Sequence, residues 1–307
     1  MSDYKNNRWI IEYFTPHEAH MHGIKKYYVV EQTPYQIVEI SETYDYGKCL
    51  FLDGKMQSSQ QDEYIYHELL IHPALVTHPN PKRVFVVGGG EGAILREILK
   101  HNTVEKIIMV DIDEKVVRLS EKYLPEWNDG TFKDKRVKLK FMDARKYLEQ
   151  TKEKFDCIII DITEPVEGGP SYLLFTREFY DIVSSRLNAD GIISLQAAST
   201  TSKDNFCHVA IYKTLKKVFP IVKTFESIIP SFSVPWGFAI ASKKYDPEKL
   251  SSKEVNNLLE KRGVNDLKHY DGIFHSRLFV LPKDLRNSYS NNKIPIIRDG
   301  NPIFTPV

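Results

Sequence analysis

Two carboxylates follow a strongly apolar stretch in FDCIIIDITEPVEGGP, residues 155–170. Apolar residues lead directly to Asp161, and Glu164 follows in a segment rich in glycine and proline. A carboxylate at the end of such a strand is costly unless it meets a cation. Two carboxylates at one site would attract an ammonium group and could accept its proton, which is general-base catalysis on an amine nucleophile. The alternative is that both residues only stabilise a turn or cap a helix.

A glycine-rich loop earlier in the chain predicts a nucleotide site. In VFVVGGGEGAILREIL, Gly88, Gly90 and Ala93 form a GxGxxA pattern between an apolar run and a helical pattern. Asp111 closes the next apolar run, about twenty residues further on, where a carboxylate can accept hydrogen bonds from ribose hydroxyls. The glycine pattern alone also fits an ordinary strand-to-helix turn. Its context and Asp111 favour a Rossmann-type nucleotide site.

Glu91, inside this loop, distinguishes between two kinds of ligand. In a dehydrogenase the free N–H groups of the loop would bind a pyrophosphate, which the charge of Glu91 would repel. A nucleoside without phosphates and with a positive charge, such as a sulfonium of the S-adenosylmethionine type, fits better. Asp143 is a candidate partner for the adenine amino group, and it is equally well placed to cap the helix predicted in ARKYLEQ.

Alternating strands and helices are expected to position these residues. Apolar strands are predicted in RVFVVG, KIIMVD, VKLKF, FDCIIID and GIISLQAA, and helices in AILREILKH, EKVVRLSEKYL and TREFYDIVSSRL. VKTFESIIP and WGFAIASK predict two further strands. This alternation predicts an α/β fold with a doubly wound, Rossmann-like parallel sheet that is covered on both faces. Its ligand crevice lies beyond the carboxyl ends of the strands, so Asp161 would point at whatever reacts with the bound nucleoside.

The chain before this region has a different pattern. From Lys26 to about Tyr66, alternating stretches such as YQIVEI and several turn signals predict short antiparallel strands and hairpins. A helical pattern in DEYIYHELLIHPALVTH ends before PNPK, which indicates a domain boundary. We expect an N-terminal β-hairpin domain at residues 1–79 and a Rossmann-like domain at residues 80–307.

The composition limits the class of protein. The 307 residues include 42 Lys and Arg and 41 Asp and Glu, so the net charge is +1, which argues against nucleic acid or a membrane surface as the main partner. The 3 cysteines form no CxxC pair, so neither a disulfide framework nor a zinc site is predicted. The N-terminus lacks the apolar core of a signal peptide, and no apolar run approaches the ~20 residues of a membrane span. We expect a cytoplasmic protein.

Three histidines in PHEAHMHG, namely His17, His20 and His22, could form a metal cluster. No cysteine or acidic constellation next to them in the sequence completes a site. Imidazoles in a mobile, polar N-terminal segment are more often plain surface groups, so no metal site is predicted.

Taken together, the motifs resemble the polyamine aminopropyltransferases, the spermidine and spermine synthase family. The similarity covers roughly Trp9 to Lys243, and the motifs that carry it are TPYQIVEI, GKCLFLDGKMQSS, DEYIYHELL, GGGEGA, DID, DA and DITEPVEGGPSYLLFT. The resemblance implies a β-hairpin domain and a methyltransferase-like domain with a seven-stranded sheet, assembled as a homodimer or homotetramer. It also implies aminopropyl transfer from decarboxylated S-adenosylmethionine, a co-substrate, to an amine, with release of methylthioadenosine and without a cofactor or metal.

The resemblance assigns roles to individual residues. Asp161 is expected to be the catalytic base, Glu164 the second carboxylate that holds the acceptor amine, and Tyr66 an acceptor-site tyrosine. The expected nucleoside-binding residues are Gln36, His67, Glu91, Asp111, Asp143 and Ala144. Gln57 and Gln196 fall where the family lines the same cavity.

Three departures from the family pattern concern the substrates. Glu91 and Glu164 stand where many members have Asp, and the segment with Ser231 and Phe232 lacks the tyrosine that spermidine synthases offer the acceptor. The chain is more similar to the archaeal and thermospermine-synthase-like branch. We expect a diamine acceptor such as putrescine, cadaverine or agmatine, with a triamine as the alternative. The alternatives of another class are a methyltransferase that uses intact S-adenosylmethionine and a nucleoside-binding module without catalysis.

Overall fold

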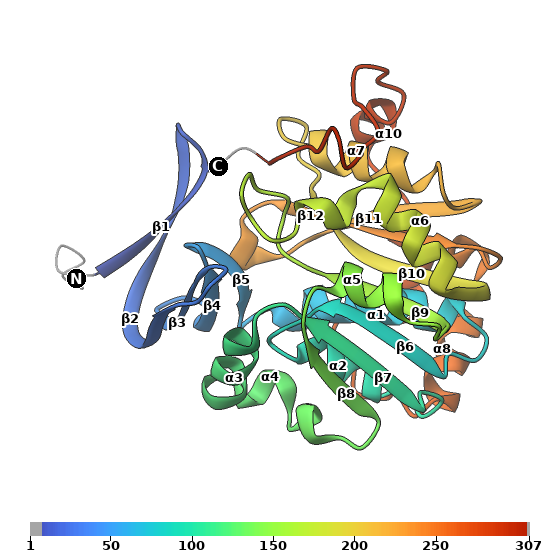
Figure 1. Cartoon of the computed structure of the whole chain (residues 1–307), viewed down its shortest axis with the longest axis horizontal. Helices are drawn as coiled ribbons and strands as arrows, with labels where there is room; N and C mark the ends of the chain where they lie inside the picture. The colour runs from blue at the N-terminus through green and yellow to red at the C-terminus, as the bar shows by residue number, and fades with distance from the viewer. Residues whose placement is uncertain (1–7, 306–307) are drawn as a thin grey trace.

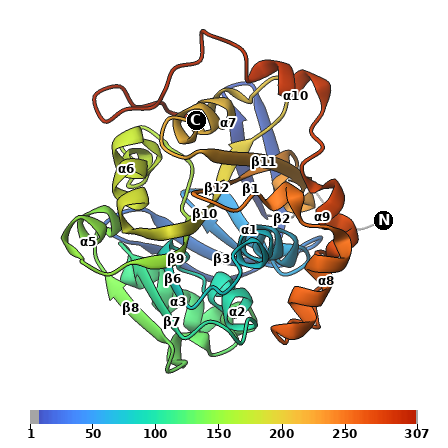
Figure 2. The same ribbon diagram turned by 90° about the vertical axis from the view of Figure 1, so that its right-hand side faces the viewer.

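Two β-sheets organise the computed structural model, which describes residues 8–305 (Figures 1 and 2). The first is a five-stranded antiparallel sheet with the order β1-β2-β3-β4-β5. Its strands are β1 (Arg8–Thr15), β2 (Glu18–Gln32), β3 (Ile37–Thr43), β4 (Gly47–Leu52) and β5 (Lys55–Ser59). Residues 1–7 and 306–307, which the expected domain ranges include, lie outside the described residues.

The N-terminal sheet starts at Arg8, earlier than the strand pattern from Lys26 onward indicates. β1 and β2 form an antiparallel ladder, and His22 in β2 is only 3 % exposed. The interpretation of the histidines as surface groups is therefore wrong for His22. The pattern of β1 is hard to recognise because its solvent-facing positions are apolar as well, among them Trp9 and Ile11.

The second sheet has seven strands in the order β11-β12-β10-β9-β6-β7-β8. They are β6 (Arg83–Gly88), β7 (Lys106–Asp111), β8 (Val137–Phe141), β9 (Phe155–Asp161), β10 (Leu187–Ser199), β11 (Ile221–Ile228) and β12 (Pro235–Ser242). β10, β9, β6, β7 and β8 are parallel, as expected, whereas β12 is antiparallel to both its neighbours. The segment between β11 and β12 is too short for the crossover that parallel strands require.

Helices cover both faces of this sheet, which confirms the doubly wound α/β fold (Figure 2). The helices are α1 (Glu63–Thr77), α2 (Ala93–Leu99), α3 (Glu114–Tyr123), α4 (Pro125–Asn128), α5 (Ala144–Gln150), α6 (Arg177–Arg186), α7 (Phe206–Leu215), α8 (Ser252–Lys261), α9 (Gly272–Leu278) and α10 (Lys283–Ser288). Val84 and Val86 of β6 pack on the side of α1, α2 and α8, whereas Phe85 and Val87 pack on the side of α5, α6 and α7. Within residues 8–305, no helix has the length and apolar character that a membrane span requires.

The two sheets are joined by a shared apolar cluster and by direct hydrogen bonds. Ile40 and Leu50 of the small sheet pack in one cluster with Trp127 of α4. The Trp127 indole Nε1 donates a hydrogen bond of 3.0 Å to Ser58 Oγ. These contacts hold the small sheet beside the carboxyl ends of the parallel strands (Figure 1). The boundary at residues 79 and 80 stays a prediction, and α1 packs against α2 and β10 of the large unit.

Candidate active site

A cavity of about 760 Å³ lies where the small sheet meets the carboxyl ends of the parallel strands. Both units contribute to its lining. Every site residue predicted from the sequence except His67 lines it, namely Gln36, Gln57, Tyr66, Glu91, Asp111, Asp143, Ala144, Asp161, Glu164 and Gln196. The fold therefore gathers residues that are up to 160 positions apart in the sequence, from 36 to 196, around one space.

The glycine loop brings the ends of three strands close together. Gly88 has a φ of 76°, and a Cβ at this position would clash with the carbonyl oxygen of Asp161. A Cβ at Gly90 would lie 3.0 Å from Asp111 Oδ2. The absence of side chains at both positions is what lets the loop lie against the two carboxylate-bearing strand ends.

Asp161, the last residue of β9, is held by a phenol from α1. The Tyr66 hydroxyl donates a hydrogen bond of 2.5 Å to Asp161 Oδ1. Burial raises the pKa of Asp161 to about 6, although His67 and the Tyr66 hydrogen bond act in the opposite direction. Burial, together with the charge of Asp161, raises the pKa of Tyr66 well above its usual range, so the phenol stays a donor. A carboxylate with a pKa near neutrality is suited to accept a proton.

Glu91 forms an ion pair with a buried histidine, His67. His67 Nε2 lies 2.6 Å from Glu91 Oε1, and His67 Nδ1 lies 2.7 Å from Glu63 Oε2. Burial alone would lower the pKa of His67, but Glu91 and Glu63 outweigh it and raise the pKa to about 10. The imidazole is therefore a cation between two carboxylates. Its side chain is fully buried, so it orients Glu91 instead of lining the cavity.

Asp111 ends β7, and Asp143 follows the neighbouring strand β8 by two residues; both line the cavity. Asp111 Oδ1 accepts a hydrogen bond of 2.8 Å from the Asp113 N–H, and burial raises the pKa of Asp111 to about 6. Asp143 Oδ1 accepts a bond of 3.1 Å from the Lys146 N–H, which confirms Asp143 as the N-cap of α5. Asp143 also lines the cavity, so its position as the cap of α5 does not exclude its predicted role as a partner of the adenine amino group. Gln36 lies nearby and donates to Asp113 Oδ2 at 3.2 Å.

Glu164 lies in the loop that follows β9. Burial raises the pKa of Glu164 to about 7, Lys55 opposes the shift, and Asp204 and Glu12 add to it. The Ser171 hydroxyl donates a hydrogen bond of 2.9 Å to the Glu164 carbonyl, which ties the two ends of the loop together. Glu164 is half-buried and lines the same cavity as Asp161.

The two predicted glutamines have local partners as well as a place in the lining. Gln57 Nε2 donates to the Lys55 carbonyl at 3.1 Å. Gln196 Nε2 donates to the Ile162 carbonyl at 2.9 Å, and its Oε1 accepts the Ala198 N–H at 2.9 Å. Gln196 therefore fixes the start of the loop that carries Glu164.

Of the two residues singled out near the end of the chain, only Phe232 lines the cavity. Ser231 is fully buried, and its N–H and hydroxyl donate to the Asp62 carboxylate at 2.7 and 2.8 Å. Trp236, the second residue of β12, lines the cavity too, although it was not among the predicted site residues. Apolar rings therefore occupy the part of the wall where the family tyrosine was expected.

Sequence reasoning missed the charged residues at the outer end of the cavity, Glu12, Lys55 and Asp204. Glu12 and Asp204 lie outside the motifs, and Lys55 lies inside GKCLFLDGKMQSS without having been predicted as a site residue. One signal was present for Glu12: in β1 it shares the inward face with Ile10, and it is only 5 % exposed. A carboxylate on the buried face of an alternating strand is costly without a function or a partner.

Family comparisons agree with this arrangement. A model described as spermine/spermidine synthase domain matches residues 63–252. The chain belongs to the spermine/spermidine synthase family. A second model, described as spermidine synthase tetramerisation domain, matches residues 8–60, which contain the whole small sheet.

Individual members of the spermine/spermidine synthase family are similar over nearly the full length. A polyamine aminopropyltransferase of Saccharolobus islandicus is 43% identical over 300 residues, covering 97% of this chain and 98% of that protein. The one of Saccharolobus solfataricus is 44% identical over 301 residues, with the same coverage. The crystal structure of spermidine synthase from Thermotoga maritima has a TM-score of 0.84 at 32% identity, covering 92% of this chain and 94% of that chain. A spermidine synthase in complex with the transition-state analogue AdoDATO has a TM-score of 0.83 at 32% identity, covering 92% and 95%.

Proposed function

We propose that the protein is a polyamine aminopropyltransferase, which transfers the aminopropyl group of decarboxylated S-adenosylmethionine to an amine and releases methylthioadenosine. One observation carries the proposal: Asp161 and Glu164 line the same cavity as the glycine loop, Asp111 and Asp143. A nucleoside site is thus adjacent to two carboxylates suited to an amine. The names of the relatives, and the analogue bound to a similar spermidine synthase, support the same reaction.

Asp161 acts as the general base in this reaction. Its carboxylate accepts a proton from the acceptor ammonium, and the freed lone pair attacks the aminopropyl carbon that is bonded to the sulfonium. A C–N bond forms as the C–S bond breaks, and the electron pair of the broken bond neutralises the sulfur. The hydrogen bond from Tyr66 keeps Asp161 oriented. Alignment of both reactants in one cavity lowers the barrier further, by roughly 7–11 kcal/mol at best.

The remaining predicted residues hold the nucleoside. Asp111 accepts hydrogen bonds from the ribose hydroxyls, Asp143 accepts one from the adenine amino group, and Gln36 and Ala144 complete this end of the cavity. Glu91, fixed by the His67 cation, binds the primary ammonium of the donor together with Asp161. Intact S-adenosylmethionine carries an additional carboxylate at this position, which both acids would repel.

The acceptor is a diamine in this proposal. Glu164 binds its ammonium group, and the rings of Phe232 and Trp236 contact its methylene chain. A triamine is the second candidate, because Glu12 and Asp204 line the same cavity, act on the pKa of Glu164 and would suit a further ammonium.

Assembly into a homodimer or homotetramer is part of the proposal. Trp9, Ile11 and Tyr13 of β1 are 43%, 44% and 53% exposed and point to the same side of the strand. Met21 lies opposite Ile11 on β2 and is 49% exposed. Such a contiguous apolar face is suited to contact a second copy.

We also place the protein in the cytoplasm, where cysteines stay reduced, because its three cysteines are free and buried.

A product analysis tests the reaction and separates it from the alternatives. The purified protein is incubated with decarboxylated or intact S-adenosylmethionine and with putrescine, cadaverine, agmatine, norspermidine or spermidine, and the products are identified by mass spectrometry. We expect methylthioadenosine and one aminopropylated amine from the decarboxylated donor only. A methylated product from the intact donor would indicate a methyltransferase. Nucleoside binding without any product would indicate a non-catalytic module.

A further inference from the structure

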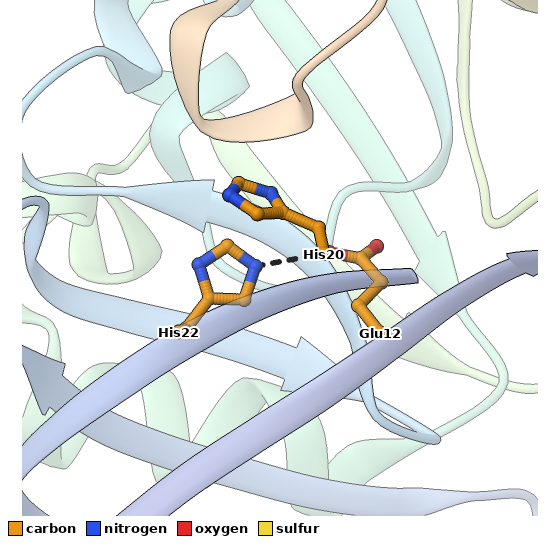
Figure 3. A group of neighbouring side chains, drawn as sticks. All are labelled: Glu12, His20 and His22. Carbon is orange, nitrogen blue, oxygen red and sulfur yellow. Dashed lines mark hydrogen bonds and ion pairs between the residues drawn. The ribbon is translucent and has the colours of Figure 1, made fainter. Parts of the chain in front are cut away.

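Glu12, His20 and His22 form a cluster on the β1–β2 ladder (Figure 3), and Glu12 and His20 line the cavity. In the ladder register Glu12 lies opposite His20, and His22 is two residues further along β2 on the same face. One potential ligand atom from each residue lies within 4.8 Å of the other two. Figure 3 shows the His22–Glu12 contact with the His20 ring beside it.

We infer that these three side chains bind a divalent transition metal of the zinc class. Two imidazoles and one carboxylate are a donor set that zinc uses in proteins, with metal-to-ligand distances of about 2.0–2.2 Å. When the ion is coordinated tetrahedrally at such distances, two of its ligand atoms lie ~3.3 Å apart. The distance of 3.2 Å between His22 Nε2 and Glu12 Oε2 is close to this separation. His20 is half-buried, and its ligand atom lies within 4.8 Å of those of Glu12 and His22, so its side chain has to move closer to complete the set.

The surroundings of the cluster already orient the ligands. Glu12 Oε1 accepts the Met56 N–H at 3.1 Å, which turns the other carboxylate oxygen toward His22. The His20 Nδ1 atom lies 2.5 Å from Ser233 Oγ. Hydrogen bonds of this kind fix the direction of metal ligands.

The site would open onto the cavity. Glu12 and His20 both contribute to the cavity wall. Because three protein ligands leave at least one coordination position free, that position is available to water or to an uncharged amine nitrogen. The competing explanation is that Glu12 and His22 form only a structural ion pair within the ladder, which needs no metal.

Cobalt binding distinguishes the two explanations, because Co²⁺ can take the place of Zn²⁺ and absorbs visible light, whereas Zn²⁺ does not. The full-length protein without an affinity tag is dialysed against a chelator and titrated with Co²⁺. We expect one equivalent to bind with strong visible absorption, and one equivalent of Zn²⁺ to displace it. Glu12→Gln and His20→Asn should each weaken cobalt binding at least ~10-fold, and His22→Gln should abolish it.

His17→Asn is the matched control, because His17 lies in the turn before β2 on the same hairpin, is exposed and is not part of the cluster. It should bind Co²⁺ as the unmodified protein does. Failure to bind Co²⁺ at micromolar concentrations would overturn the inference. The inference would also be overturned if Glu12→Gln and His20→Asn bound Co²⁺ as tightly as the unmodified protein does. A loss of Co²⁺ binding in the His17 variant alone would overturn it as well. Circular dichroism checks folding, and if His22→Gln does not fold, the other two variants decide.

Discussion

The Tyr66 hydroxyl donates a hydrogen bond of 2.5 Å to the carboxylate of Asp161. Tyr66 lies in α1, which follows the small sheet, whereas Asp161 ends β9 in the centre of the large one. The bond therefore joins the proposed base to the helix at the junction of the two units. It stabilises the ionised form of Asp161, while burial opposes ionisation.

Replacement of Asp161 by Asn should nearly abolish turnover. The amide keeps the shape of the side chain but cannot accept the ammonium proton, and general-base catalysis is worth about 10²–10⁴-fold. We expect kcat to fall by this amount while the affinity for methylthioadenosine changes much less. Steady-state kinetics and calorimetry measure the two quantities. Full activity in this variant would remove Asp161 from the role of base.

The rate should depend on pH through Asp161. Burial raises its pKa to about 6, and only the deprotonated form accepts a proton, so kcat/KM should rise as the pH passes upward through about 6. Tyr66→Phe removes a hydrogen bond that favours the carboxylate, and this rising limb should move to higher pH. Profiles of kcat/KM for both proteins test this. If kcat/KM rises at the same pH in the variant, Tyr66 does not affect the pKa of Asp161.

Loss of the His67 cation should destabilise the fold. His67→Ala leaves Glu91 buried without its cationic partner, whereas Glu63 keeps its ion pair with Arg96, and breaking a buried pair costs about 3–5 kcal/mol. Urea unfolding measures the difference, and His17→Ala, an exposed replacement, should leave stability unchanged. If the free energy of unfolding is the same in His67→Ala as in the unmodified protein, His67 does not form a stabilising ion pair.

The same cation gives stability a pH dependence. The pKa of His67 is about 10 in the folded protein and 6.5 for the ordinary group. Because the pKa is raised on folding, the stabilisation is complete below pH 6.5 and is lost as the pH rises toward 10. Unfolding free energies measured between these limits should fall with pH, and the fall should be smaller in His67→Ala. Equal slopes for the two proteins would argue against a charged His67.

The exposed face of β1 should hold the oligomer together. Ile11→Lys with Tyr13→Lys places two charges on an apolar face that solvent already reaches, so the subunit should still fold. We expect the mass in solution, measured by light scattering, to fall from a multiple of the chain mass toward 35.6 kDa. Lys253→Glu, an exposed charge change in α8, is the control. An unchanged mass in the double variant would place the interface elsewhere.

The glycine loop and the strand ends could be predicted from the sequence because their signals are local. Gly88 and Gly90 are required where the backbone approaches other strands, and that requirement leaves a readable pattern. Apolar runs that end in Asp111 and Asp161 indicate parallel strands whose carboxyl ends meet at one edge. The individual strands of the large sheet could be predicted as well, because each apolar run is recognisable without reference to its neighbours.

Tertiary structure alone decided how distant segments meet. The position of His67 behind Glu91 depends on how α1 packs against the glycine loop. The meeting of Glu12 with His22 depends on the register of β1 against β2, since a shift by one residue would turn one of them to the other face. The sequence by itself thus determined the strand and loop chemistry of the proposed nucleoside site. Packing and register, which no local pattern encodes, determined the partners of its charges.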